Sequence, residues 1–226
     1  MSRYTITDAL KDPVALILRI PGIWAIWGGK RLDPHLREEV MIAVATSVGC
    51  RYCTFSHREI VLQSGEDLMA LAEFEQVEDH DENTFAAIIW AQAKVEAGFG
   101  PVSPAIEREL RSRFTDSQCR DIETVALAMK LMSSCGHEAD SLVERLQGKP
   151  RPGSSLGNEM LMATLYFPPA ALVGLALAKK RGSFRSMISD FRKFSANFDR
   201  GPRLRSPSGS PAARSVSSPP LPVRPR

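Results

Sequence analysis

The sequence predicts an all-α fold. Along the 226 residues, apolar side chains return mostly at intervals of three and four positions, which is the repeat of one helix face, and the alternation typical of a strand is missing. Helix start and stop signals recur in the same segments. Apolar residues make up 43% of the chain, enough to form one sizeable core. We therefore expect a single helical domain with appendages.

The chain is expected to have three parts. We expect a helical domain over residues 1–150, a helical extension over 151–198 and a tail over 199–226. The early apolar stretch 13–29 is interrupted by Pro13, Arg19 and Pro21 and has no clear cleavage site, so it does not indicate a secretory signal. A cytoplasmic protein is expected.

The first clear helix signals surround residues 33–65. Asp33 followed by Pro34 is typical of a helix N-cap and first helical residue, and Gly49 can end that helix in a left-handed conformation. A second helix is expected to follow from Cys50 and to stop near Gly65.

Three more helix starts and stops follow the same logic. A helix over 83–97 runs to Gly98, and Ser103 with Pro104 opens the next one. Thr115 and Gln118 have the spacing of a capping box. We expect this last helix to end at Gly136, a short helix to follow it, and residues 148–155 to form a linker.

The longest apolar run covers residues 160–178 and contains Pro168, Pro169 and Gly174. It reaches the length of a membrane span, but these interruptions favour a core or oligomer-interface helix that starts near Pro169. No membrane helix is expected.

Residues 199–226 are rich in arginine, proline and serine and hold few large apolar groups. Such a segment cannot offset the entropy lost on ordering, so we expect a disordered tail. The chain has a net charge of +3, and its last 27 residues hold six arginines. Without these arginines, the net charge of residues 1–199 is about −3. Arginines without interleaved aromatics indicate a solubilising tail and no specific nucleic-acid partner.

Two of the four cysteines and one of the four histidines lie within residues 49–57. A close cysteine pair in a reducing compartment indicates redox chemistry or a metal site more than a structural disulfide. On a helix, Cys50, Cys53 and His57 fall within roughly 60° of one another. If Gly49 interrupts the helix, both cysteines occupy the first turn of the next one, where free N–H groups and the helix dipole favour a thiolate.

Glu38 and Glu39 lie 12 and 11 residues before Cys50. On one unbroken helix they would be too far from the cysteines to act on them. If the chain reverses at Gly49, however, one of these glutamates can approach His57 and orient its ring, as a third group does beside a nucleophile and its base.

The segment 37–57, REEVMIAVATSVGCRYCTFSH, resembles the signature of the AhpD-like alkylhydroperoxidases within the carboxymuconolactone decarboxylase superfamily. That signature is Glu, eleven residues, Cys, two residues, Cys, three residues, His, and Glu38, Cys50, Cys53 and His57 match it at those spacings. The resemblance therefore selects Glu38 over Glu39. Family members often carry a histidine between the cysteines, where this chain has Tyr52.

The resemblance implies a role for each matched residue. Cys53 would attack the peroxide, Cys50 would resolve the product, and His57 and Glu38 would relay protons. It covers residues 30–65 strongly and continues more loosely to residue 150. It also implies a trimer or higher homo-oligomer, a peroxide substrate, a dithiol or lipoyl-protein reductant and no cofactor.

Two other functions compete with a peroxidase. Two thiolates and His57 are three plausible zinc ligands, to which Cys119, Cys135 or His137 would add a fourth. Alternatively, the cysteine pair only senses oxidation in a regulatory or partner-binding protein. Cys119 and Cys135 lie on an apolar helical pattern, so we expect them to be small core residues.

Overall fold

The computed structural model of the chain describes residues 4, 6–28, 31–65 and 81–198. Within these ranges it contains nine α-helices and no strand, which confirms the all-α prediction. The predicted tail over 199–226 lies outside the described residues. The helices are α1 (Ile6–Ile17), α2 (Ile20–Trp27), α3 (Pro34–Val48), α4 (Arg51–Ser64), α5 (Glu82–Glu96), α6 (Pro104–Arg113), α7 (Asp116–Leu146), α8 (Leu156–Arg181) and α9 (Phe184–Phe198).

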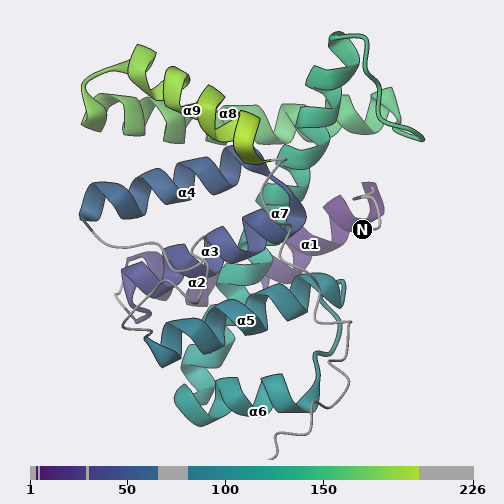
Figure 1. Cartoon of the computed structure of the whole chain (residues 1–226). Coiled ribbons are helices and arrows are strands. Elements are labelled where there is room, and N and C mark those ends of the chain that lie inside the picture. The colour runs from purple at the N-terminus through teal and green to yellow at the C-terminus, as the bar shows by residue number, and fades with distance from the viewer. Residues whose placement is uncertain (1–3, 5, 29–30, 66–80, 199–226) are drawn as a thin grey trace, which may run out of the picture.

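The helices form a stack that α7 crosses from end to end (Figure 1). In this view α6 and α5 lie at the bottom, α3 and α4 in the middle, and α8 and α9 at the top. The centre of the stack is α3, which packs against α4, α5 and α7. Its residues 38–45 are all buried, so the helix that carries Glu38 is held on several sides.

The predicted caps around α3, α6 and α7 are present. The Asp33 carboxylate accepts a hydrogen bond from the Leu36 N–H at 3.0 Å, and Ser103 caps α6 in the same way. Thr115 and Gln118 form the expected capping box at the start of α7. Each cap satisfies backbone N–H groups that have no partner within the helix, which explains why local sequence signals located these starts.

The prediction that Gly136 ends a helix was wrong, because α7 continues without interruption to Leu146. Close packing accounts for the glycine. A Cβ atom at position 136 would lie 2.6 Å from the Cys50 Sγ and 2.8 Å from the Tyr166 ring. Gly136 is therefore required by its neighbours and not by its own backbone.

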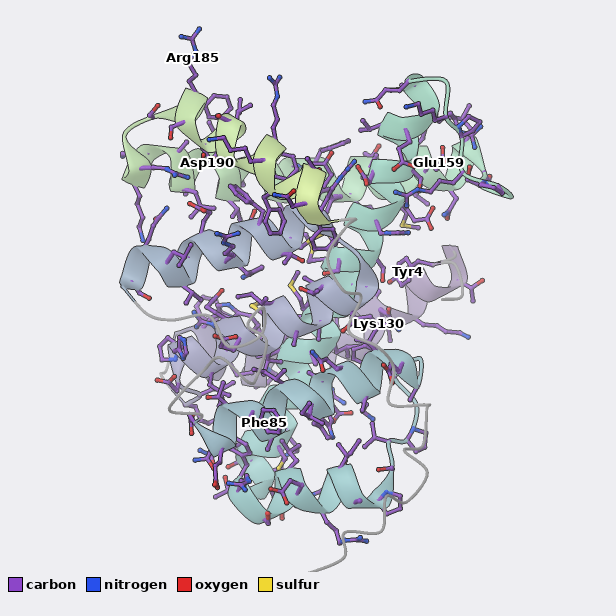
Figure 2. The ribbon with its side chains drawn as sticks, in the orientation of Figure 1. Tyr4, Phe85, Lys130, Glu159, Arg185 and Asp190 are labelled. Carbon is purple, nitrogen blue, oxygen red and sulfur yellow. A yellow bond between two sulfur atoms is a disulfide. The ribbon has the colours of Figure 1, made fainter. Side chains whose placement is uncertain are left out.

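The predicted start of the last apolar helix near Pro169 was also wrong. α8 begins at Leu156 and passes through Pro168 and Pro169. The φ of proline suits a helix, but each proline removes a backbone hydrogen bond and its ring crowds the preceding turn, a cost that the packing of α8 against α7 offsets. The start of α8 is held against α7 by Glu159 (labelled in Figure 2), which is fully buried and accepts a hydrogen bond from Arg145 at 2.6 Å.

α8 has one buried side and one exposed apolar side. Its exposed members include Leu165, Leu172 and Leu175, which are 51%, 70% and 61% exposed. Among the described residues it is the helix long and apolar enough to cross a membrane, with 22% of its apolar window buried. Length and composition fit both a membrane span and a helix covered by another copy, so the oligomer interface stays a prediction.

Candidate active site

The chain reverses direction at Gly49, between α3 and α4. Gly49 has φ 84° in the left-handed region and caps α3, a conformation that glycine adopts without a steric penalty. Cys50 is the N-cap of α4, and its Sγ accepts a hydrogen bond from the Cys53 N–H at 3.3 Å. The expected turn therefore places both cysteines at a helix N-terminus.

Cys50 and Cys53 are joined by a disulfide, with their Cα atoms 5.4 Å apart. They are 1% and 6% exposed. Cys53 is thus the more accessible of the two, and it lines a pocket described below, whereas Cys50 faces Gly136 of α7.

A carboxylate from α3 meets the imidazole from α4. Glu38 Oε2 lies 2.6 Å from His57 Nδ1, so His57 donates through Nδ1–H, and in the neutral imidazole Nε2 is then the acceptor. Glu39, the neighbouring glutamate, lies instead 3.5 Å from His35 and is fully buried. Of the two glutamates, the structure brings Glu38 to His57.

Arg37 completes this pair, although no sequence pattern pointed to it. Its guanidinium donates to Glu38 Oε1 at 2.9 and 3.1 Å. Burial by itself would raise the pKa of the Glu38 carboxyl, but the hydrogen bonds and charges of His57 and Arg37 outweigh it and lower this pKa. Glu38 is therefore a buried carboxylate held in its charged form.

A pocket of about 240 Å³ opens onto Cys53 and His57. The other walls come from α2, α3, α4, α7 and α8 and are mostly apolar. They are Trp27, Met41, Ser56, Ala128, Met129, Met132, Tyr166, Pro169, Ala170 and Val173. A small organic molecule in this pocket would reach the Cys53 sulfur while its remaining atoms contact apolar side chains.

Tyr166 of α8 is a second site residue that the sequence did not indicate. Its hydroxyl lies 3.5 Å from the Cys53 Sγ and 4.0 Å from the Cys50 Sγ. The side chain is buried, and burial is the main cause of a raised pKa for its phenol. A tyrosine more than a hundred residues away in sequence from the cysteines has no local pattern that would reveal the contact.

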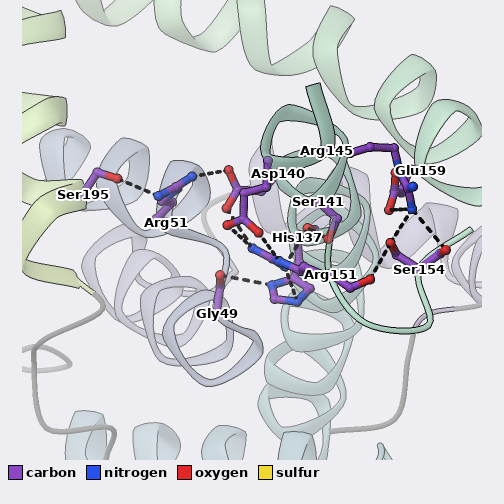
Figure 3. Close-up of polar contacts among 11 residues, drawn as sticks. Gly49, Arg51, His137, Asp140, Ser141, Arg145, Arg151, Ser154, Glu159 and Ser195 are labelled. Atoms are coloured by element: carbon purple, nitrogen blue, oxygen red, sulfur yellow. Dashed lines mark hydrogen bonds and ion pairs between the residues drawn. The ribbon is translucent and has the colours of Figure 1, made fainter. Parts of the chain in front are cut away.

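A polar network on the far side of the turn holds Gly49 in place (Figure 3). His137 of α7 donates from Nδ1 to the Gly49 carbonyl at 3.3 Å, and its Nε2 accepts from Arg151 at 2.9 Å. Arg151 also bonds Asp140 at 3.2 Å, and Asp140 pairs with Arg51 at the start of α4. His137 therefore uses both ring nitrogens in positioning the turn.

The other two cysteines lie in the body of the fold. Cys119 and Cys135 are buried free thiols, and burial raises both pKa values, that of Cys135 to about 11. Among the described residues, no group of three or more His, Cys, Asp and Glu side chains is arranged to hold a metal ion. The zinc alternative thus gains no support from the described side chains.

No family model, curated protein or solved structure matches the chain.

Proposed function

We propose that the protein is a thiol-dependent peroxidase in which Cys53 attacks the peroxide and Cys50 closes a disulfide. The observation that carries this proposal is the position of the Glu38–His57 pair, 2.6 Å between Oε2 and Nδ1, beside the pocket that Cys53 lines. It agrees with the resemblance to the AhpD-like alkylhydroperoxidases, which assigns the same residues the same roles.

The first step oxidises Cys53. With the disulfide reduced, His57 Nε2 takes the thiol proton and Cys53 is left as a thiolate at the helix N-terminus. The thiolate attacks the terminal peroxide oxygen, an S–O bond forms and the O–O bond breaks. The leaving alkoxide takes the proton back from His57, so the products are a Cys53 sulfenic acid and an alcohol.

The second step joins the two cysteines. The Cys50 sulfur attacks the sulfenic sulfur of Cys53, an S–S bond forms, and the hydroxyl leaves as water with the proton of the Cys50 thiol. The Cα atoms are already 5.4 Å apart, within the range of disulfides. An external dithiol, such as a lipoyl group, then reduces the bridge by thiol–disulfide exchange and is itself oxidised.

Glu38 acts on this chemistry through His57. It accepts from Nδ1–H, fixes the ring orientation and stabilises the imidazolium that forms when the thiol proton is taken. Arg37 holds the second carboxylate oxygen and so keeps Glu38 charged and in place. Cytoplasmic location and assembly into trimers or higher oligomers belong to the same proposal.

The test is peroxide consumption with dihydrolipoamide as the reductant. We expect turnover of cumene hydroperoxide by the wild type and none above background by Cys53→Ser. Cys135→Ala is the matched control, since it removes a buried thiol outside the site. Equal rates for the wild type and Cys53→Ser would refute the proposed activity.

A further inference from the structure

The Tyr166 hydroxyl is buried next to the sulfur atoms of Cys53 and Cys50. The side chain is 4% exposed, and the partners found for its hydroxyl among the described side chains are the sulfurs of Cys53 and Cys50, at 3.5 and 4.0 Å. A buried phenol O–H normally finds an oxygen or nitrogen acceptor. A disulfide sulfur is a weak acceptor, so in the oxidised protein this hydroxyl is only weakly satisfied.

We propose that Tyr166 is a further catalytic residue of the site, which donates a hydrogen bond to the Cys53 thiolate in the reduced protein. This inference rests on the proposed peroxidase function for its role in turnover. The stabilisation of the Cys53 thiolate by the phenol can be measured without any peroxide turnover, as a change in the pKa of Cys53.

The redox state decides the strength of this contact. When the disulfide is reduced, Cys53 becomes a thiolate that accepts a charge-assisted hydrogen bond, and such bonds are roughly twice as strong as neutral ones. The low dielectric of the buried site strengthens it further. Tyr166 therefore stabilises the reactive form of Cys53 more than the disulfide, which is the requirement for a group that activates the nucleophile.

The surroundings of Tyr166 indicate that the contact is built into the fold. Gly136 leaves the space that both the Tyr166 ring and the Cys50 sulfur occupy, because a Cβ there would approach them to 2.8 and 2.6 Å. Phe167 packs edge-on against the Tyr166 ring at 6.0 Å. Burial raises the pKa of the phenol, so it keeps its proton at neutral pH and remains a donor.

Few other titratable groups face the Cys53 sulfur. In the described structure, the N-cap of α4 contributes Cys50, and α4 contributes His57, which lines the same pocket as Cys53. α3 contributes Glu38, which acts through His57. The α7 wall of the pocket consists of Ala128, Met129 and Met132, which carry no charge. Besides the Cys50 thiol, the Tyr166 phenol and the His57 imidazole are thus the titratable groups next to the reactive thiol in the described structure, and they come from different helices.

Tyr166→Phe tests the proposal, because it keeps the ring and removes only the hydroxyl. Cys53 alkylation by iodoacetamide is followed against pH in the fully reduced chain, with the labelled peptide quantified by mass spectrometry. We expect the midpoint of Cys53 labelling to rise by about one pH unit or more, the value of one hydrogen bond to a charged group. Peroxide turnover at neutral pH should fall by roughly tenfold and recover toward the wild-type rate at high pH.

Tyr52→Phe is the matched control. Tyr52 lies next to Tyr166, with ring centroids 6.3 Å apart, but it stacks on Phe191 and no hydrogen bond joins its hydroxyl to a sulfur in the described contacts. Its removal should leave the Cys53 midpoint unchanged. Tyr166→Met, which fills a similar space without a hydroxyl, serves if the phenylalanine variant does not fold.

The outcomes separate this proposal from the peroxidase itself. An unchanged Cys53 midpoint in a folded Tyr166 variant would overturn the role of the phenol, whatever the turnover. A shifted midpoint in a protein that consumes no peroxide would support the hydrogen bond and refute the enzymatic function. An equal shift of the Cys53 midpoint in Tyr52→Phe would also overturn the role of Tyr166, since the shift would then not depend on contact with sulfur.

Discussion

The corner between α3 and α4 and the helix α7 each carry two cysteines, and the two pairs are about equally buried. Cys50 and Cys53 are 1% and 6% exposed, and Cys119 and Cys135 are 6% and 3% exposed. Exposure therefore does not separate a candidate redox pair from two core thiols.

The difference lies in what surrounds each sulfur. Cys50 and Cys53 begin a helix, share a hydrogen bond between Sγ and N–H, and adjoin the Tyr166 hydroxyl. Cys135 lies inside α7 with its Sγ 3.7 Å from the Met162 thioether, and burial raises its pKa to about 11. Compared with Cys135, Cys53 is favoured for ionisation by its position at a helix N-terminus and by its polar neighbours, more than by access to solvent.

The sharpest contrast should appear in thiol reactivity. In the reduced protein at pH 7 we expect iodoacetamide to label Cys53 at least about 100-fold faster than Cys135, because a thiol with a pKa near 11 is ionised in roughly one molecule in ten thousand at that pH. Peptide mass spectrometry over a time course measures both rates in one sample. Similar labelling rates at Cys53 and Cys135 would contradict the proposed difference in reactivity between the two cysteine pairs.

The next largest effect concerns the carboxylate at the α3–α4 corner. Glu38→Gln should lower peroxide turnover by about 100-fold, because His57 loses the group that orients it and stabilises its charged form. Glu39→Gln is the control, since that carboxylate lies beside His35. A Glu39 variant as slow as the Glu38 variant, per folded molecule, would show that the assignment of Glu38 is wrong.

Two glycines on neighbouring helices test the packing around the cysteine pair. Gly136→Ala would force a Cβ to within 2.6 Å of the Cys50 sulfur, so we expect a loss of about 1–3 kcal/mol in unfolding free energy. Gly174→Ala meets no atom within 4 Å and should stabilise α8 by roughly 0.5–1 kcal/mol, the difference in helix propensity. Chemical denaturation of both variants measures these changes. Equal stabilisation by both substitutions would contradict the close approach of α7 to Cys50.

The smallest effect is a pH dependence at the corner. The pKa of the Glu38 carboxyl is lowered from its ordinary value of 4.5 in the folded protein. Its contribution to stability is therefore complete above that value and is lost as the pH falls through the lower folded pKa. Urea unfolding between about pH 6 and pH 3 should show the difference between the wild type and Glu38→Gln shrinking with acid. A difference that grows as the pH falls would reverse the sign of this coupling.

Helix ends and the α3–α4 corner were predictable because their signals are local. Asp33, Gly49 and Thr115 act on backbone groups a few residues away, and a cap motif in the sequence is the same motif in the structure. The contact between Glu38 and His57 was also predictable, because a chain reversal at Gly49 places the helix that carries Glu38 beside the helix that carries His57.

The contributions of α7 and α8 to the site could not be predicted in this way. Gly136 has the appearance of a helix stop, and only the contact with Cys50 and Tyr166 explains why it lies inside α7. Pro168 and Pro169 indicate a helix start, but packing of α8 along α7 carries the helix through them. Tyr166 reaches the cysteines only through tertiary structure.

Oxidation of the reduced chain with one equivalent of peroxide, followed by peptide mass spectrometry, tests the central claim most directly. We predict a new Cys50–Cys53 bridge while Cys119 and Cys135 remain thiols, and in Cys50→Ser a sulfenic acid trapped at Cys53. A sulfenic acid that forms first at Cys119 or Cys135, or a Cys53 thiol that survives unmodified, would contradict the account.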